Sequence, residues 1–197
     1  MIAGLVLAAG ESRRMGRDKA LLLYRGRTFL DNILASLAAA GIEKVAVVLG
    51  HHAEAIQRAV KPAEARVVVN YDYQRGQTSS LQTGLAALAP DSPEAVILCL
   101  VDHPAISPEI IGKLIDQFES THPLVIIPTH KGQRGHPVVI GQELFPELLA
   151  LTPEAPANAV IRKYRNATQF VEVADPGILV DVDDPEAYER LVAASKQ

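Results

Sequence analysis

The 197-residue sequence contains one cysteine and no tryptophan, and aromatic residues make up only 5% of it. A single cysteine excludes an intramolecular disulfide framework and a cysteine-rich zinc site. Cys99 lies inside the apolar run 96–101, which favours a small buried hydrophobic side chain over a nucleophile. One free thiol also fits a reducing compartment, so we expect a cytoplasmic protein.

The sequence also lacks an excess of positive charge and any long apolar segment. Its formal net charge is -4, so we expect neither a nucleic acid nor a membrane surface as its partner. No apolar stretch approaches the roughly 20 residues that span a bilayer. Segment 1–10 lacks the positively charged start of a signal peptide and reads as a first strand. Basic residues gather only at 13–19, a cluster suited to a small anion.

Short apolar runs alternate with helical periods along the chain. Strands are predicted at 2–8, 45–49, 66–69, 96–101, 124–127, 136–140, 170–173 and 178–182, and helices at 28–40, 53–60, 79–89, 144–149, 159–164 and 184–194, with a further helix starting at 107. This order predicts an α/β fold, a Rossmann-like three-layer sandwich with a mostly parallel sheet, in a single domain spanning 1–197. Ligands of such folds bind beyond the carboxyl ends of the strands.

The loop at 7–19 follows the first predicted strand, is rich in small residues and ends in Lys19. Small residues let a backbone approach a ligand, and free N–H groups in such a loop bind anions. Arg14 and Lys19 add the positive charge that a triphosphate needs. No Gly-Lys-Ser/Thr ends the loop, so it is not a P-loop, and no Gly-x-Gly-x-x-Gly is present. An ordinary charged surface loop remains the alternative.

A serine-rich segment at 76–85 contains Ser79 and Ser80 at a predicted helix start. Free N–H groups and hydroxyls at a helix start suit a polar ligand. Taken alone, an ordinary helix cap explains the segment equally well.

Acidic residues follow two predicted strands. Asp102 ends the strand at 96–101, where a carboxylate is well placed to hold Mg²⁺, although it could simply cap a turn before Pro104. Asp181 and Asp183 are predicted to share one face of the last strand, where like charges repel unless a cation or hydrogen bonds relieve them. Asp184 is explained as the cap of the final helix.

Two histidines are candidates for binding a second substrate. His136 lies between glycine and proline in segment 135–137, and His103 follows Asp102 directly, although it could simply face solvent. We interpret the remaining histidines as surface or loop residues without defensible ligand spacing, namely His51, His52, His122 and His130.

These motifs together resemble one family. The run 7–19 reads Leu-Ala-Ala-Gly-x-Ser-x-Arg-Met-Gly-x-x-Lys and closely resembles the signature loop of nucleotidyltransferases related to the molybdenum cofactor guanylyl- and cytidylyltransferases. Similar enzymes also carry a Ser-Ser-x-x-x-Gly-Leu element, an Asp-x-Pro and a terminal Asp-x-Asp, as this chain does at 79–85, 102–104 and 181–183. Ala-Ala-Gly and Gly-His-Pro, at 8–10 and 135–137, resemble the cytidylyl branch. His103 departs from many relatives, which carry Gln or Met there.

The resemblance implies the nucleotidyltransferase fold and a role for each motif. It implies nucleotide binding by Leu7, Ala8, Ala9, Gly10, Arg14, Lys19 and Ser80, with Lys19, Arg14 and Asp102 taking part in catalysis. It also implies a Mg²⁺ cofactor on Asp102 with Asp183, or Asp181 as the second choice, and acceptor contacts from His136 and His103.

The implied reaction is attack by an acceptor phosphate on CTP, with release of pyrophosphate. By resemblance the acceptor is molybdopterin bearing molybdenum, and a molybdenum hydroxylase would receive the product. Two alternatives stay open: a nucleotidyltransferase of the same fold acting on a sugar or polyol phosphate, and a non-catalytic accessory protein of a molybdenum enzyme.

Overall fold

The computed structural model describes residues 1–60 and 65–195 and places its long strands in one mixed sheet. The strand order is β10-β7-β9-β6-β1-β4-β5, with the short β8 paired to β7. Only β8 and β9 among these strands run antiparallel to their neighbours, so the predicted α/β fold with a mostly parallel sheet is confirmed. The strands are β1 (Ile2–Ala8), β4 (Val45–Leu49), β5 (Arg66–Val69), β6 (Ala95–Leu100), β7 (Val125–His130), β8 (Gln133–Arg134), β9 (Val138–Gly141) and β10 (Thr168–Glu172).

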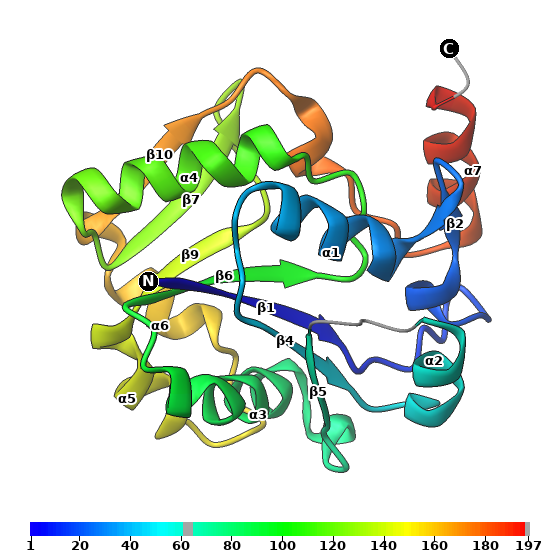
Figure 1. The fold of residues 1–197 in the computed structure, drawn as a ribbon, viewed down its shortest axis with the longest axis horizontal. Helices are drawn as coiled ribbons and strands as arrows, with labels where there is room; N and C mark the ends of the chain where they lie inside the picture. The colour runs from blue at the N-terminus through cyan, green and yellow to red at the C-terminus, as the bar shows by residue number, and fades with distance from the viewer. Residues whose placement is uncertain (61–64, 196–197) are drawn as a thin grey trace.

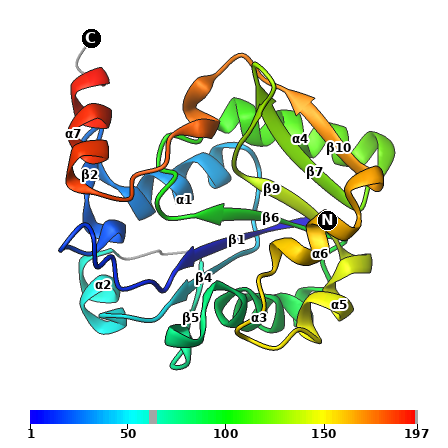
Figure 2. The ribbon, with the colours of Figure 1, turned by 180° about the vertical axis from the view of Figure 1, so that it is seen from behind.

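Helices cover both faces of this sheet (Figures 1 and 2). One face carries α1 (Phe29–Ala39) and α4 (Pro108–Thr121), and the other carries α3 (Gln77–Leu88), α5 (Phe145–Leu149) and α6 (Asn158–Lys163). Further along the carboxyl edge of the sheet lie α2 (Ala53–Ala59), the hairpin of β2 (Leu23–Tyr24) and β3 (Arg27–Thr28), and α7 (Pro185–Ala194). None of the helices within the described ranges is long and apolar enough to cross a membrane.

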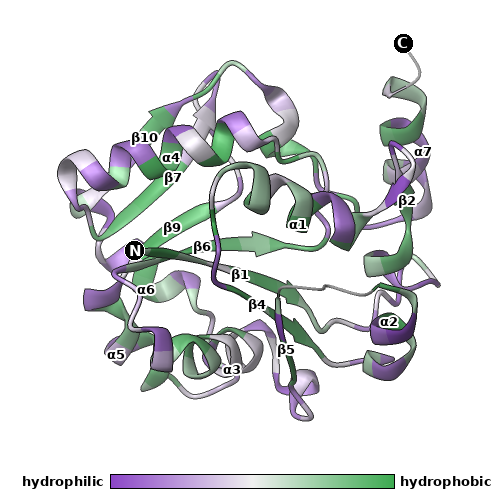
Figure 3. Ribbon diagram, in the orientation of Figure 1, coloured by the Kyte–Doolittle hydropathy of each residue, from purple (hydrophilic) through white to green (hydrophobic). Residues whose placement is uncertain are grey.

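The core divides into two layers because successive strand residues face opposite sides. In β1, Val6 packs toward α1 and α4, whereas Leu5 and Leu7 pack toward α3. Both layers are apolar, which explains why the central strands read as continuous hydrophobic runs (Figure 3). A smaller third cluster joins the 7–19 loop to the C-terminal segment and consists of Met15, Leu22, Tyr24, Phe29, Val182 and Leu191.

Three of the helix starts that the sequence predicted are capped by side chains. The side chains of Thr28, Ser107 and Asp184 each accept a hydrogen bond from a backbone N–H three residues on, at the starts of α1, α4 and α7. Most other predicted bounds hold to within two residues, although β7 continues to His130, three residues beyond its predicted end. The hairpin of β2 and β3 was not predicted.

The strand predicted at 178–182 is wrong. The chain instead forms a short 3-10 helix at Pro176–Leu179, whose start is capped by the Asp175 side chain. This segment bonds to two different partners: Ile178 O, inside the 3-10 helix, accepts from His136 N, and Val182 N, beyond the helix, donates to Asp102 O. Ile178 and Val182 are fully buried, so the apolar pattern correctly indicated burial, but the segment forms no strand ladder with the described residues. Asp181 and Asp183 therefore do not share a strand face.

Helix α3 lies unusually close to the sheet at Gly84. A Cβ added there would lie 2.2 Å from Leu5 Cδ1 and 3.0 Å from Val48 Cγ2. Any larger residue would push the helix away from β1 and β4. Because Gly84 has no side chain, the start of α3, which carries Ser79 and Ser80, can lie close to the sheet.

Gly84→Ala is expected to destabilise the fold by about 1–3 kcal/mol, because the extra methyl overpacks a filled core. The matched control is Gly112→Ala on α4, where an added Cβ meets nothing within 4 Å. That change should be neutral or stabilise the protein by up to about 1 kcal/mol, because alanine favours helix. Urea unfolding of both variants measures the difference, and equal effects would contradict the close packing of α3.

Candidate active site

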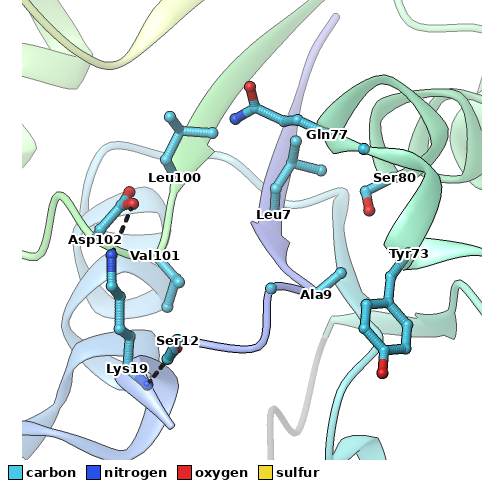
Figure 4. A pocket seen from close by; sticks show the side chains of 12 residues that line it. Leu7, Ala9, Ser12, Lys19, Tyr73, Gln77, Ser80, Leu100, Val101 and Asp102 are labelled. Carbon is cyan, nitrogen blue, oxygen red and sulfur yellow. Dashed lines mark hydrogen bonds and ion pairs between the residues drawn. The ribbon is translucent and has the colours of Figure 1, made fainter. Parts of the chain in front are cut away.

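A pocket of about 260 Å³ opens at the carboxyl ends of β1 and β6, beside the start of α3 (Figure 4). Its lining includes six predicted residues, Leu7, Ala9, Gly10, Lys19, Ser80 and Asp102, and also Ser12, Tyr73, Gly76, Gln77, Leu100 and Val101. Ala8, the last residue of β1, packs instead into the layer that faces α1 and α4. The three edge positions singled out by the sequence therefore meet in one place.

The 7–19 loop is shaped by its own contacts. Ser12 and Gly16 have positive φ values of 51° and 67°, and Gly16 N donates to Ser12 O over 3.0 Å. The hydroxyl of Ser12 accepts a 3.2 Å hydrogen bond from the backbone N–H of Lys19. Met15 is buried in the third cluster, which anchors the loop. The loop thus turns back on itself and presents its end to the pocket.

Lys19 lies between two carboxylates at the pocket floor. Its Nζ is 3.2 Å from Asp102 Oδ2 and 2.6 Å from Asp183 Oδ1, while its side chain is only 10% exposed. Arg14 is not part of the lining; its guanidinium lies 2.6 Å from Asp183 Oδ2. The hydrogen bond from Lys19 is the main cause that lowers the pKa of Asp183, and Arg14 adds to it. Asp183 is therefore firmly ionised and doubly paired.

Asp181 occupies a different environment. Asp102, His103 and Asp181 each offer a ligand atom, and these atoms lie within 4.8 Å of one another. Burial raises the pKa of Asp181, and the charge of Asp102 raises it further. Asp102 Oδ1 is buried and has no hydrogen-bond partner among the described residues. A cation would relieve this crowding of negative charge. The geometry groups Asp181 with Asp102, whereas Asp183 is paired to Lys19 and Arg14.

His103 and His136 lie against each other, with ring centroids 4.5 Å apart. Burial lowers the pKa of His136 to about 4, and burial also lowers the pKa of His103. Gly135 permits this arrangement, because a Cβ there would lie 2.3 Å from Ile178 O. Two neutral imidazoles therefore lie beside Asp102, where they can accept or donate hydrogen bonds without adding charge.

Sequence reasoning missed Asn70, which positions the serines of α3. Its Nδ2 donates to the hydroxyls of Ser79 and Ser80, at 2.8 and 3.0 Å. Its Oδ1 accepts from the backbone N–H of Asp72. Asn70 follows β5 directly, so the carboxyl-edge rule that selected Asp102 also pointed to it.

The structure also brings together Asp18, His51 and His52, although the sequence reading treated both histidines as surface or loop residues. His52 is 58% exposed, and its Nδ1 lies 3.1 Å from Asp18 Oδ1. His51 is half-buried, with Nδ1 3.2 Å from the Tyr73 hydroxyl. The other histidines match the prediction in part: His122 is exposed at the end of α4, but His130 ends β7.

Known proteins resemble this chain in sequence. A family model for the MobA-like NTP transferase domain matches residues 4–168. Nicotine blue oxidoreductase of Paenarthrobacter nicotinovorans is 31% identical over 198 residues, covering 97% of this chain and 96% of that protein. A probable molybdenum cofactor guanylyltransferase of Mycobacterium avium (strain 104) is 34% identical over 134 residues, covering 64% of this chain and 62% of that protein.

The fold also matches solved structures. The crystal structure of Rv0371c from Mycobacterium tuberculosis H37Rv superposes with a TM-score of 0.86 at 30% identity, covering 98% of this chain and 97% of that one. A second crystal structure of Rv0371c, in complex with manganese, superposes with a TM-score of 0.80 at 28% identity and covers 98% of both chains. The sheet and its helices are therefore shared along almost the whole chain.

Lys19→Met is expected to destabilise the protein by roughly 1–3 kcal/mol, because Asp102 and Asp183 lose the cation between them. The loss is smaller than for a fully buried pair, since the Asp183 side chain is 33% exposed. The control is Lys163→Met, which breaks the surface pair with Glu147 and should change the free energy of unfolding far less, because both groups are solvent-exposed. Denaturant unfolding measures both changes. Equal losses would mean that Lys19 is merely another surface charge.

Proposed function

Because the chain belongs to the MobA-like NTP transferase family, and is a nucleotidyltransferase of that family, we propose that it transfers the cytidylyl group of CTP to molybdopterin bearing molybdenum. The observation that carries the proposal is the convergence of the 7–19 loop, Lys19 and Asp102 on the pocket that Ser80 also lines. A small anion-binding loop and a carboxylate at strand ends are what a nucleoside triphosphate requires. The curated relatives named molybdenum cofactor guanylyltransferase support the choice of acceptor.

The proposed chemistry is an in-line displacement at phosphorus. An oxygen of the acceptor phosphate attacks the α-phosphorus of CTP, the bond from that phosphorus to the bridging oxygen breaks, and pyrophosphate leaves with the electron pair. Catalysis then consists of positioning and charge stabilisation. Lys19 and Arg14 neutralise the charge that grows on the departing pyrophosphate. Both lie on the loop that turns back at Gly16 and both contact Asp183, although only Lys19 lines the pocket.

The residues present fit a divalent cation. One oxygen of Asp102 accepts from Lys19, and the other is buried and has no partner in the part of the chain that the structure describes. Asp181 lies beside it and has a raised pKa. We assign the cation to Asp102 with Asp181 or Asp183, and we propose Mg²⁺ as the ion used in turnover. When bound, it supplies positive charge to the phosphate oxygens. Carboxylate ligands completed by water and phosphate suit this ion.

We assign the acceptor to the side of the site where His103 and His136 lie. Their rings are in contact, and burial keeps both neutral near pH 7. Neutral imidazoles orient an acceptor by hydrogen bonds while leaving its attacking phosphate oxygen unpaired. His103 lies in the loop after β6 and His136 in the loop after β8, so two loops would supply the contact with the acceptor.

The same site also supports the wider alternative of a sugar or polyol phosphate as acceptor, because the phosphate chemistry is unchanged. A non-catalytic accessory role is disfavoured, since a carrier has no need of Lys19 between two acids. The near-full-length relative named nicotine blue oxidoreductase favours a second candidate, an oxidoreductase activity. The 7–19 loop lacks the Gly-x-Gly-x-x-Gly of dinucleotide-binding folds, which weighs against it. Incubation with NADH or NADPH and an electron acceptor, followed by nicotinamide absorbance, tests that candidate directly.

Asp102→Ala is expected to abolish pyrophosphate release from CTP, Mg²⁺ and molybdopterin while leaving the fold intact. The substitution removes the carboxylate that faces both Lys19 and the proposed cation, where transition-state charge is stabilised. Circular dichroism and thermal unfolding serve as the check on folding. A folded variant that turns over at the wild-type rate would remove Asp102 from the mechanism.

CTP is expected to be preferred over GTP in kcat/KM by about tenfold to a hundredfold. The buried Ala9 lines the pocket, and its methyl group narrows the space for a purine. Gln77 also lines the pocket, but its amide both donates and accepts, so it can pair with either base edge. Ala9→Gly should relax the preference in part. Equal kcat/KM values, or a preference for GTP, would show the cytidylyl assignment to be wrong.

A further inference from the structure

His103 is a buried imidazole beside Asp102. Its residue is 8% exposed, and its Nδ1 has no partner among the residues that the structure describes. Its other nitrogen, Nε2, lies 4.0 Å from Asp102 Oδ1. Asp102 Oδ1 is likewise buried and without a partner. A buried carboxylate oxygen is costly without a partner, and Nε2 is the ring nitrogen that lies across from it, at a separation that one metal ion can bridge.

The groups around this point suit a positively charged ligand. Asp181 adds a third ligand atom within 4.8 Å of the other two. Lys19 relieves only Asp102 Oδ2, at 3.2 Å, and its closer contact is to Asp183. Two carboxylates and a ring nitrogen therefore meet at a point where a cation would offset the negative charge.

We propose that His103 is a metal ligand through Nε2, together with Asp102 and Asp181, and that this site prefers Mn²⁺ to Mg²⁺. Mg²⁺ requires a tight octahedron of oxygen atoms, whereas an imidazole nitrogen is a better donor to a first-row transition ion. The inference deepens the metal requirement of the proposed function and rests on it for its catalytic meaning. The binding of the ion itself follows from the three side chains alone.

The group of Asp18, His51 and His52 is a weaker candidate for the same ion. His52 is well exposed, and its Nδ1 already contacts the Asp18 carboxylate. The Nδ1 of His51 contacts the Tyr73 hydroxyl. These ring nitrogens have partners, so nothing in that group requires a cation.

The test is direct binding of Mn²⁺ to the full-length protein without nucleotide, followed by electron paramagnetic resonance and by competition with Mg²⁺. In His103→Gln, which keeps a polar side chain but removes the imidazole, Mn²⁺ affinity should fall about tenfold or more. Mg²⁺ affinity should change by less than about threefold, because its oxygen ligands remain. Unchanged Mn²⁺ affinity, or an equal loss of both ions, would overturn the proposal.

A spectroscopic signature gives a second readout that does not depend on how the variant folds. Electron spin echo modulation of the Mn²⁺-loaded wild-type protein should show coupling to a directly bound imidazole nitrogen, and its absence overturns the proposal. His122→Asn is the matched control, because His122 lies at the far end of α4, roughly 20 Å along the helix. His52→Gln tests the group of Asp18, His51 and His52. If the nitrogen signal is lost in His52→Gln and kept in His103→Gln, the assignment to His103 is overturned.

These measurements need no turnover. Pyrophosphate release from CTP is measured separately on the same preparations. A protein that binds Mn²⁺ through His103 but releases no pyrophosphate keeps the metal assignment and refutes the proposed function. A protein that releases pyrophosphate from CTP but shows no nitrogen coupling keeps the proposed function and refutes the metal assignment.

Discussion

The ion pair of Lys19 with two aspartates is the constraint on which the arrangement of the site depends. It joins the loop after β1, the end of β6 and the segment before α7, positions separated by 83 and 164 residues. Most of the Lys19 side chain is withdrawn from water, so its charge requires these partners. The ammonium group of Lys19 thereby holds the end of β6, the loop after β1 and the segment before α7 in fixed positions around it.

Apolar packing next to this ion pair also holds the loop and the C-terminal segment together. Met15 of the loop, Val182 beside the two acids and Leu191 of α7 share one small apolar cluster. Apolar contact is non-directional, so it brings the loop and the C-terminal segment together without fixing where their charges fall. Hydrogen bonds do the fixing, as Val182 N shows by donating to Asp102 O over 2.9 Å. In this segment, apolar burial therefore brings the parts together, and hydrogen bonds fix their relative positions.

Much of this was predictable from sequence, because the signals are local. Caps such as Ser107 and buried runs such as 45–49 carry their structure in a few adjacent residues. The carboxyl-edge rule also selected Lys19 and Asp102 correctly as pocket residues. The strand at 178–182 failed because alternating burial says which side chains face inward and not which strand lies alongside. Asn70 and the trio around Asp18 were missed for the same reason: their partners lie on other elements.

The pairing of Asp183 with both Lys19 and Arg14 has a thermodynamic consequence. An anion that draws these two cations onto itself leaves Asp183 without counter-charge, and the cluster of acids then attracts a divalent ion more strongly. By linkage, an ion bound among the acids releases the two basic side chains toward an anion by the same free energy. Under the proposed function, a polyphosphate and a metal ion would therefore be cooperative ligands of this cluster, each of them raising the affinity for the other.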